Sequence, residues 1–213
     1  MTSDGQGINI AVLVSGQGRG TNLQAIMDAC ANGRIDGRVA VVIGVKDDAP
    51  AMQRARDQQV EAVAASPKDY SPEDYDAVLL SVLRDFKVDL VCLAGYMRKI
   101  GQPIIDAYRN RIMNVHPALI PMFFGQGMFG HHVHEAAIER GVRVSGATVH
   151  FVDEDYDTGP IIIQKFVTVM FDDTPDTLAA RILPEEHRAY VEAIQLFARG
   201  RLRVEGRKVR ILE

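Results

Sequence analysis

A chain of 213 residues is long enough to form one globular domain with its own hydrophobic core. Hydrophobic residues make up 47% of it and charged residues 24%, which excludes a disordered chain, and the formal net charge of −4 excludes a basic surface for non-specific nucleic-acid binding. Any anionic ligand must therefore be held by a local site.

Cysteine usage and the N-terminus bear on the cellular compartment. The two cysteines, Cys30 and Cys92, each lie in an apolar pattern, which favours buried thiols in a reducing compartment. Residues 1–7 have neither a basic flank nor an apolar stretch, so we expect a short frayed tail and no signal peptide. Since no run approaches the ~18 consecutive apolar residues of a membrane span, we expect a cytoplasmic protein without a membrane partner.

The first half of the chain alternates short β-branched runs with amphipathic stretches, which is the rhythm of a parallel sheet covered by helices. A buried strand is predicted over Ile8–Ser15, followed by a helix that Thr21 caps and Gly33 ends. The next predicted elements, in the order strand, helix, strand, helix, strand, are Arg38–Val45, Ala51–Gln59, Glu61–Ala65, Ser71–Phe86 and Leu90–Ala94.

The second half continues the pattern. Strands are predicted over Arg111–Val115, Gly146–Phe151 and Ile161–Met170. A helix is predicted to begin at Thr174-Pro175, to be interrupted by Pro184 and to be followed by a final helix up to Gly200; Val204–Leu212 is predicted as a terminal hairpin. Because the sequence contains no repeat, low-complexity tract or linker, we predict a single α/β domain over residues 1–213 with a mostly parallel central sheet.

The glycine-rich segment Ser15–Asn22 follows the first predicted strand and opens a helix. Such a turn exposes backbone N–H groups at a helix N-terminus and attracts phosphate, helped here by the Thr21 hydroxyl and Arg19. A plain tight turn between strand and helix explains the glycines equally well. The segment does not match a dinucleotide fingerprint, because its third glycine comes too early, and no lysine follows as in a Walker loop.

The sequence Asn114-Val115-His116-Pro117 lies at the carboxyl end of a predicted strand, where open α/β sheets bind their ligands. Asp157 follows downstream, directly before a Thr-Gly-Pro turn. A carboxamide, an imidazole and a carboxylate supply an oxyanion donor, a proton carrier and an acid to hold it, which suits acyl-type transfer. The alternative is that His116 is a packed residue and Asn114 caps the strand, but the strand-end placement favours catalysis.

Two other clusters match metal sites poorly. The acidic loop Asp153–Asp157 resembles a calcium loop only superficially, because Thr158 occupies the glycine position and Gln164 the position of the bidentate glutamate. We expect its acids other than Asp157 to be surface charges. The motif His131-His132-Val133-His134 lacks the further ligands of a zinc site, so we expect a helix start or a substrate edge there, with metal binding as the weaker alternative.

Ordered motifs along essentially the whole chain resemble phosphoribosylglycinamide formyltransferase, the folate-dependent family of purine synthesis. The matching segments are Val12–Ile26 with GTNLQAI, Leu93–Arg98 (LAGYMR), Met113–Pro121 (MNVHPALIP), Gly146–Val152 (GATVHFV) and Asp157–Ile161 (DTGPI). Several motifs in register are more specific than any one of them. The Asn-x-His-Pro motif with the later aspartate is shared by the wider formyltransferase superfamily, so it indicates the chemistry more firmly than the acceptor.

The resemblance implies a Rossmann-like formyltransferase fold and transfer of a formyl group from 10-formyltetrahydrofolate to the amine of glycinamide ribonucleotide, with no metal. Asn114 and protonated His116 would stabilise the oxyanion, while Asp157 would raise the imidazolium population and relay protons through water. His116 and Asp157 would titrate as a coupled pair. The resemblance leaves open whether the protein is a monomer or a homodimer.

By the same matching, the N-terminal part binds the ribonucleotide and the C-terminal part completes the folate site. The implied ribonucleotide residues are Gly18, Arg19, Gly20, Thr21 and Asn22, which hold the phosphate, and Glu186, which contacts the sugar. The implied folate residues are Met97, Arg98, Lys99, Ile100, Asn114, Val152 and Asp157. An apparent insertion at Gly18-Arg19 leaves open which N–H groups bind phosphate, and a longer segment over Gly125–His132 leaves open the roles of His131 and His134.

Four alternatives remain open. Methionyl-tRNA formyltransferase and formyltetrahydrofolate hydrolase share the core motifs, but each carries an added domain, so the chain length disfavours both. A nicotinamide oxidoreductase could use the glycine-rich segment together with Asp47 or Asp48 as its ribose-binding acid. A non-catalytic nucleotide-binding module would leave Asn114, His116 and Asp157 without a role.

Overall fold

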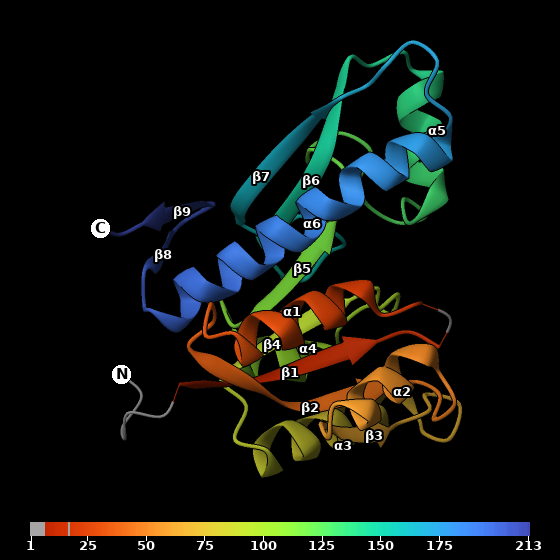
Figure 1. The fold of residues 1–213 in the computed structure, drawn as a ribbon. Helices are drawn as coiled ribbons and strands as arrows, with labels where there is room; N and C mark the ends of the chain where they lie inside the picture. The colour runs from red at the N-terminus through yellow and green to blue at the C-terminus, as the bar shows by residue number, and fades with distance from the viewer. Residues whose placement is uncertain (1–6, 17) are drawn as a thin grey trace.

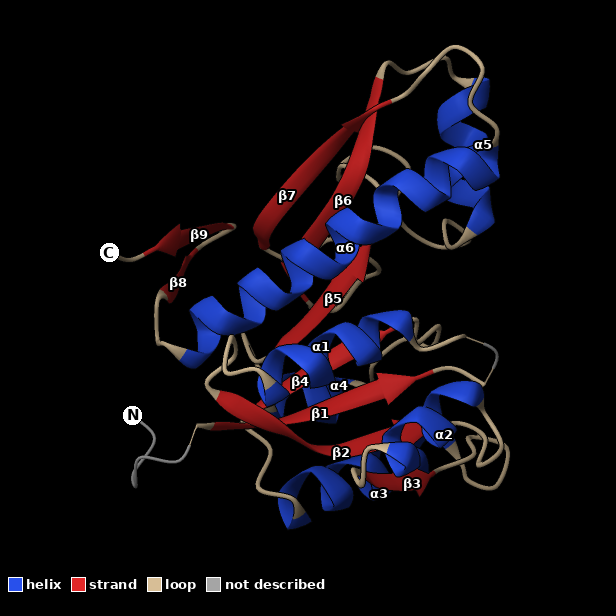
Figure 2. Cartoon of the chain, in the orientation of Figure 1, coloured by secondary structure: helices blue, strands red, loops and turns tan. Residues whose placement is uncertain are grey.

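The computed structural model describes residues 7–16 and 18–213. The predicted tail therefore lies outside the described residues except for Gly7, and so does Gln17 of the glycine-rich segment. Within the described ranges the strands form one nine-stranded sheet in the order β3-β2-β1-β4-β5-β6-β7-β9-β8, and helices cover both of its faces (Figures 1 and 2). The predicted α/β class with a mostly parallel sheet is confirmed.

The first five strands run parallel and are joined by helices. The strands are β1 (Ile8–Val14), β2 (Gly37–Gly44), β3 (Glu61–Ala64), β4 (Leu90–Ala94) and β5 (Ile112–His116). The helices are α1 (Thr21–Ala31), α2 (Pro50–Asp57), α3 (Pro72–Asp85) and α4 (Gln102–Ala107). The strand order reverses between β1 and β4, and such a switch point opens a crevice at the carboxyl ends of the strands.

The later strands add an antiparallel extension. β6 (Val144–Phe151) pairs antiparallel with β5 and with β7 (Ile161–Thr168), and the hairpin of β8 (Leu202–Glu205) and β9 (Lys208–Ile211) continues the sheet. Helix α5 (His131–Glu139) precedes β6, and the long helix α6 (Pro175–Ala198) crosses the sheet diagonally in Figure 1. The β5–β6 pairing sets His150 directly opposite Asn114.

Apolar residues form one cluster on each face of the sheet. Helices α1 and α6 pack on one face, while α3 and α4 pack on the other. The hydroxyl of Tyr190 on α6 is fully buried and contacts both the Met113 carbonyl, at 2.8 Å, and the Leu93 carbonyl, at 3.1 Å. A buried carbonyl needs a donor, so this side chain fastens α6 to β4 and β5.

Two local predictions were wrong. Pro184 does not interrupt the helix, because α6 continues through it from Pro175 to Ala198. The missing proline N–H weakens one turn, but Leu178 and Ile182 before it and Tyr190 after it are buried against the sheet and hold the helix together. Thr21 does not cap α1 either: the N-cap is Gly20, whose φ is 71° and whose added Cβ would lie only 2.9 Å from that of Ala51.

The remaining predicted strands and helices are confirmed to within two residues, including the terminal hairpin. Helix α4 was not predicted, because six residues are too few to show helical periodicity. Across the part of the chain that the structure describes, no helix combines the length and the apolar character needed to cross a membrane.

Candidate active site

A cavity of about 560 Å³ opens at the carboxyl ends of β4 and β5, close to the switch point. Its lining consists of Leu93, Gly95–Ile100, Asn114–Pro117, Gly125–Gly130, parts of His150–Asp157, and Asn22, His134 and Glu186. A cavity of this size suits a small-molecule ligand. The predicted site residues can therefore be placed relative to one open cavity.

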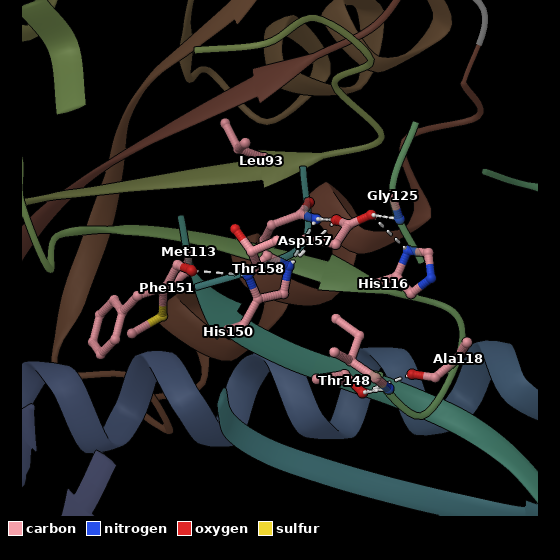
Figure 3. Close-up of polar contacts among 12 residues, drawn as sticks. Leu93, Met113, His116, Ala118, Gly125, Thr148, His150, Phe151, Asp157 and Thr158 are labelled. Carbon is pink, nitrogen blue, oxygen red and sulfur yellow. Dashed lines mark hydrogen bonds and ion pairs between the residues drawn. The ribbon is translucent and has the colours of Figure 1, made fainter. Parts of the chain in front are cut away.

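The three catalytic candidates meet at this cavity. Asn114 and His116 are two residues apart on β5, so their side chains lie on the same face of the sheet. His116 Nδ1 lies 3.6 Å from Asp157 Oδ2 (Figure 3). Asn114 Nδ2 donates to Asp157 Oδ1 at 3.2 Å. The structure thus brings together the carboxamide, the imidazole and the carboxylate.

The turn that carries Asp157 is shaped by its sequence. Asp157 adopts a left-handed backbone with φ 57°, which aspartate tolerates better than most residues. Position 159 requires glycine, because an added Cβ there would lie 1.8 Å from the Phe151 carbonyl oxygen. The turn therefore packs directly on the end of β6, and its Pro160 carbonyl accepts from the Phe151 N–H at 2.9 Å. These contacts aim the Asp157 carboxylate at β5.

His150 joins the same group, although no role was predicted for it. Its Nε2 lies 3.5 Å from Asp157 Oδ1, and its Nδ1 donates to the Phe151 carbonyl at 2.8 Å (Figure 3). The same Nε2 lies 3.3 Å from Asn114 Nδ2. The ring is almost fully buried on β6. A histidine inside the mostly apolar strand segment GATVHFV is the sequence signal that could have revealed it.

The segment after His116 closes over the group. His116 Nε2 donates to the Phe123 carbonyl at 2.7 Å, and the Gly125 N–H donates to Asp157 Oδ2 at 3.2 Å. Buried Thr148 anchors the start of this segment, since its hydroxyl donates to the Ala118 carbonyl at 2.6 Å (Figure 3). Both nitrogens of His116 therefore face acceptors, an arrangement that only the imidazolium form satisfies completely.

Burial and neighbouring charges set the protonation states of His116 and Asp157. Burial lowers the pKa of His116 below its ordinary value and outweighs Asp157 and the Phe123 carbonyl, both of which raise it. Burial alone would raise the pKa of Asp157, but the hydrogen bond with His150 and the charge of His116 bring it below its ordinary value. Asp157 thus raises the pKa of His116 as expected, yet near neutral pH the resting imidazole is neutral beside an ionised carboxylate.

Two of the implied ribonucleotide residues line the cavity. Asn22 Nδ2 donates to Glu186 Oε2 at 3.1 Å, and burial raises the pKa of Glu186. Asn22 Oδ1, His134 Nδ1 and His187 Nε2 are buried without a hydrogen-bond partner among the described residues. Unpaired buried polar atoms are costly, and a bound ligand is one way to pair them.

The rest of the implied phosphate loop lies off the cavity wall. Gly18, Arg19, Gly20 and Thr21 do not line the cavity as described. The Gly18 N–H donates to Ser15 Oγ at 3.3 Å, and Arg54 Nε donates to the Arg19 carbonyl at 2.6 Å. The loop thus borders the cavity through Asn22.

All seven implied folate residues line the cavity: Met97, Arg98, Lys99, Ile100, Asn114, Val152 and Asp157. The Arg98 guanidinium lies 5.3 Å from the centre of the Tyr75 ring, which fixes it by a cation–π contact. Met97 is half exposed, and it leaves an apolar surface at the mouth of the cavity.

The acidic loop forms ion pairs and the histidine motif begins a helix. Glu154 pairs with Arg109 at 2.9 Å and Asp155 with Lys99 at 3.3 Å, and both acids are exposed as expected. The expectation was wrong for Asp153, which is half-buried at the cavity and accepts from the Thr158 hydroxyl. His131 begins α5, which confirms the predicted helix start, and His134 is buried at the cavity. Over residues 7–16 and 18–213, no group of three or more His, Cys, Asp or Glu side chains could hold a metal ion.

Comparison with known proteins matches this architecture to formyl transfer. A family model described as formyl transferase matches residues 8–194. The structure of glycinamide ribonucleotide transformylase 1 from Symbiobacterium toebii superposes with a TM-score of 0.92 and 52% identity, covering 99% of this chain and 96% of that one. Phosphoribosylglycinamide formyltransferase of Escherichia coli K12 is 39% identical over 92% of this chain and 90% of its own length.

A plant relative is longer. The chloroplastic phosphoribosylglycinamide formyltransferase of Arabidopsis thaliana is 40% identical over 91% of this chain, and the chain spans 66% of its length. The part of this chain that matches the formyl transferase family model, residues 8–194, contains every residue that lines the cavity.

Proposed function

The chain belongs to the formyl transferase family, and from this premise we propose that it transfers a formyl group from 10-formyltetrahydrofolate to the amine of glycinamide ribonucleotide. The products are formylglycinamide ribonucleotide and tetrahydrofolate, which places the reaction in purine synthesis. The observation that carries the proposal is the contact of Asn114, His116 and His150 with Asp157 at the end of a cavity of about 560 Å³. We propose one catalytic domain, in which the glycine-rich segment and the later strands serve the same cavity.

In the first step the amine nitrogen attacks the formyl carbon, and negative charge develops on the formyl oxygen. Asn114 donates an amide N–H to that oxygen, and His116, which takes a proton from solvent before the attack and returns it to solvent after the products form, stabilises the oxygen by its positive charge. The developing charge favours the imidazolium form, for which both ring nitrogens already face acceptors at Phe123 and Asp157. Asp157 then stabilises the imidazolium as its ionised partner.

The second step moves one proton. The nitrogen of the attacking amine must lose a proton, while N10 of the folate must gain one when its bond to the formyl carbon breaks. Asp157 relays this proton through water, and its low pKa keeps it ionised before transfer. Because His116 and Asp157 are coupled, the macroscopic pKa values of the reaction belong to the pair.

The remaining lining residues bind the two substrates in the proposal. Glu186 accepts hydrogen bonds from the ribose hydroxyls, and Asn22 offers its unpaired Oδ1 to a donor of the ribonucleotide. The segment Gly18–Thr21 borders the phosphate at the start of α1. The folate ring lies against Met97–Ile100 and Val152, where exposed backbone supplies alternating donors and acceptors.

A spectroscopic assay tests the proposal. The protein is incubated with 10-formyltetrahydrofolate, with and without glycinamide ribonucleotide, and the absorbance of the folate is followed. We expect conversion that depends on the ribonucleotide. Conversion at the same rate without the ribonucleotide would show that the protein is a hydrolase and not a transferase. No conversion in either sample would refute formyl transfer.

A further inference from the structure

The C-terminal hairpin touches the turn that carries Asp157. Arg207, in the turn between β8 and β9, donates from its guanidinium to the carbonyl of Thr158 at 2.6 Å. Directly after the turn, Ile161 at the start of β7 pairs with Lys208 of β9. Figure 1 shows the hairpin beside the start of β7, at the end of the sheet. The segment 158–161 is therefore held from outside by the hairpin.

This contact comes from beyond the part of the chain that the family model matches. The match ends at residue 194, whereas the hairpin occupies Leu202–Ile211. The catalytic candidates Asn114, His116 and Asp157 all lie within the matched part. Arg207 is therefore a contribution to the site from a region whose sequence carries no motif of formyl transfer.

Three contacts hold the turn that carries Asp157. Asp157 is held in a left-handed conformation with φ 57°, and one side of the turn is fixed by the packing of Gly159 on the Phe151 carbonyl. Thr158 Oγ1 donates to Asp153 Oδ1 at 2.5 Å, within the same loop. The hydrogen bond from Arg207 reaches the Thr158 carbonyl from another element, and a charged donor makes a stronger bond than a neutral one.

We propose that Arg207 is a positioning residue for the proposed reaction: by fixing the Thr158 carbonyl, it holds the Asp157 carboxylate between His116 and His150. The inference rests on the proposed function, because the carboxylate that it places is the one assigned to the proton relay. Asp157 is faced by His116 from β5, by His150 from β6 and by the Gly125 N–H. A loosened turn would move the carboxylate relative to all three.

A matched control lies on the same hairpin. Arg210 pairs with Glu205 at 3.0 Å, within the hairpin, so Arg210→Ala removes an exposed cation and an ion pair without touching Thr158. Arg207→Lys keeps the charge and one donor but loses the planar guanidinium. The set Arg207→Ala, Arg207→Lys and Arg210→Ala therefore separates the contact with Thr158 from the general stability of the hairpin.

Three readouts test the proposal. We expect Arg207→Ala to lower kcat by about fivefold with little change in KM for the ribonucleotide, since small displacements of a catalytic group cost rate and Glu186 lies elsewhere. Amide hydrogen exchange of residues 153–160 should become faster. The pKa of His116, followed by NMR of the labelled imidazole, should fall further, because the Asp157 charge that raises it is held less firmly. Arg207→Lys should recover part of each effect, and Arg210→Ala should resemble the wild type.

Equal kcat, exchange and His116 pKa in Arg207→Ala and Arg210→Ala would overturn the inference. Its failure is distinguishable from failure of the proposed function. If the wild type does not transfer formyl groups to the ribonucleotide, the proposed function fails, whereas hydrogen exchange still tests the Arg207 contact because it needs no substrate.

Discussion

The side-chain amide of Asn22 donates to the Glu186 carboxylate at 3.1 Å, which joins the start of α1 to the middle of α6 at the cavity wall. These two residues are 164 positions apart in the chain. The oxygen of the Asn22 amide is buried and has no partner within the described residues. A pair with one satisfied contact and one unsatisfied atom is typical of a site that is completed by its ligand.

Glu186→Gln should weaken ribonucleotide binding and increase the stability of the folded protein. Burial raises the pKa of Glu186, so its stabilising contribution is present at acidic pH and is lost as the pH rises through the folded-state pKa. The uncharged glutamine should therefore raise the free energy of unfolding at pH 7, as measured by urea denaturation. Affinity for the ribonucleotide should fall about tenfold, because a charged acceptor is lost.

Glu185→Gln is the control for this exchange, since Glu185 pairs with Arg188 at 2.9 Å and does not line the cavity. Glu185→Gln should neither weaken ribonucleotide binding nor raise the free energy of unfolding. If Glu186→Gln binds the ribonucleotide as tightly as the wild type, the sugar contact is assigned to the wrong residue.

His116→Ala and Asp157→Asn should each reduce turnover by at least ~100-fold, as expected when an acid-base or oxyanion group is removed. Both proteins should retain folate binding, because most of the folate wall is formed by other residues. Glu154→Gln removes a carboxylate from the same loop that pairs with Arg109 on the surface, and its turnover should stay within about threefold of the wild type. Steady-state kinetics check all three, and near-normal rates in the first two variants would show that the roles are misassigned.

The first strands and the placement of Asn114 and His116 together on β5 could be predicted because they depend on local patterns. Short β-branched runs mark strands, and the spacing of Asn114 and His116 places both on one face of a strand end. The approach of His150 to Asp157 could not be predicted, since it depends on the antiparallel register that sets His150 opposite Asn114. The same applies to the Phe123 carbonyl, whose position depends on the path of a loop. At Pro184, tertiary packing of α6 overrides the local preference against helix.

His150→Ala should slow the reaction about tenfold, because the Asp157 carboxylate loses one of the groups that place it. His150 lowers the pKa of Asp157, so its removal raises that pKa and Asp157 is protonated at a higher pH as the solution is acidified. The acidic limb of the profile of kcat against pH should therefore move to higher pH.

His132→Ala serves as the control for His150→Ala, since His132 is exposed on α5 near Glu135. His132→Ala should leave the profile of kcat against pH unchanged. A profile of His150→Ala that coincides with that of the wild type would exclude His150 from control of Asp157.

Tyr190→Phe should lower the free energy of unfolding by about 1–3 kcal/mol, because the buried carbonyls of Met113 and Leu93 lose their shared donor. Urea denaturation gives the value, and Tyr70→Phe, at an exposed position, should be neutral. Equal stability of the two variants would mean that the Tyr190 hydroxyl does not fasten α6 to the sheet.

The central claim is that the cavity transfers a formyl group to glycinamide ribonucleotide with Asn114, His116 and Asp157 in place. The most direct measurement uses 10-formyltetrahydrofolate labelled with ¹³C in the formyl group and follows the label by NMR in the wild type and in Asp157→Asn. We predict that the wild type moves the label to the amide of the ribonucleotide product, and that Asp157→Asn leaves it on the folate over the same period. Label recovered from the wild type as free formate, or remaining on the folate despite both substrates, would contradict the account.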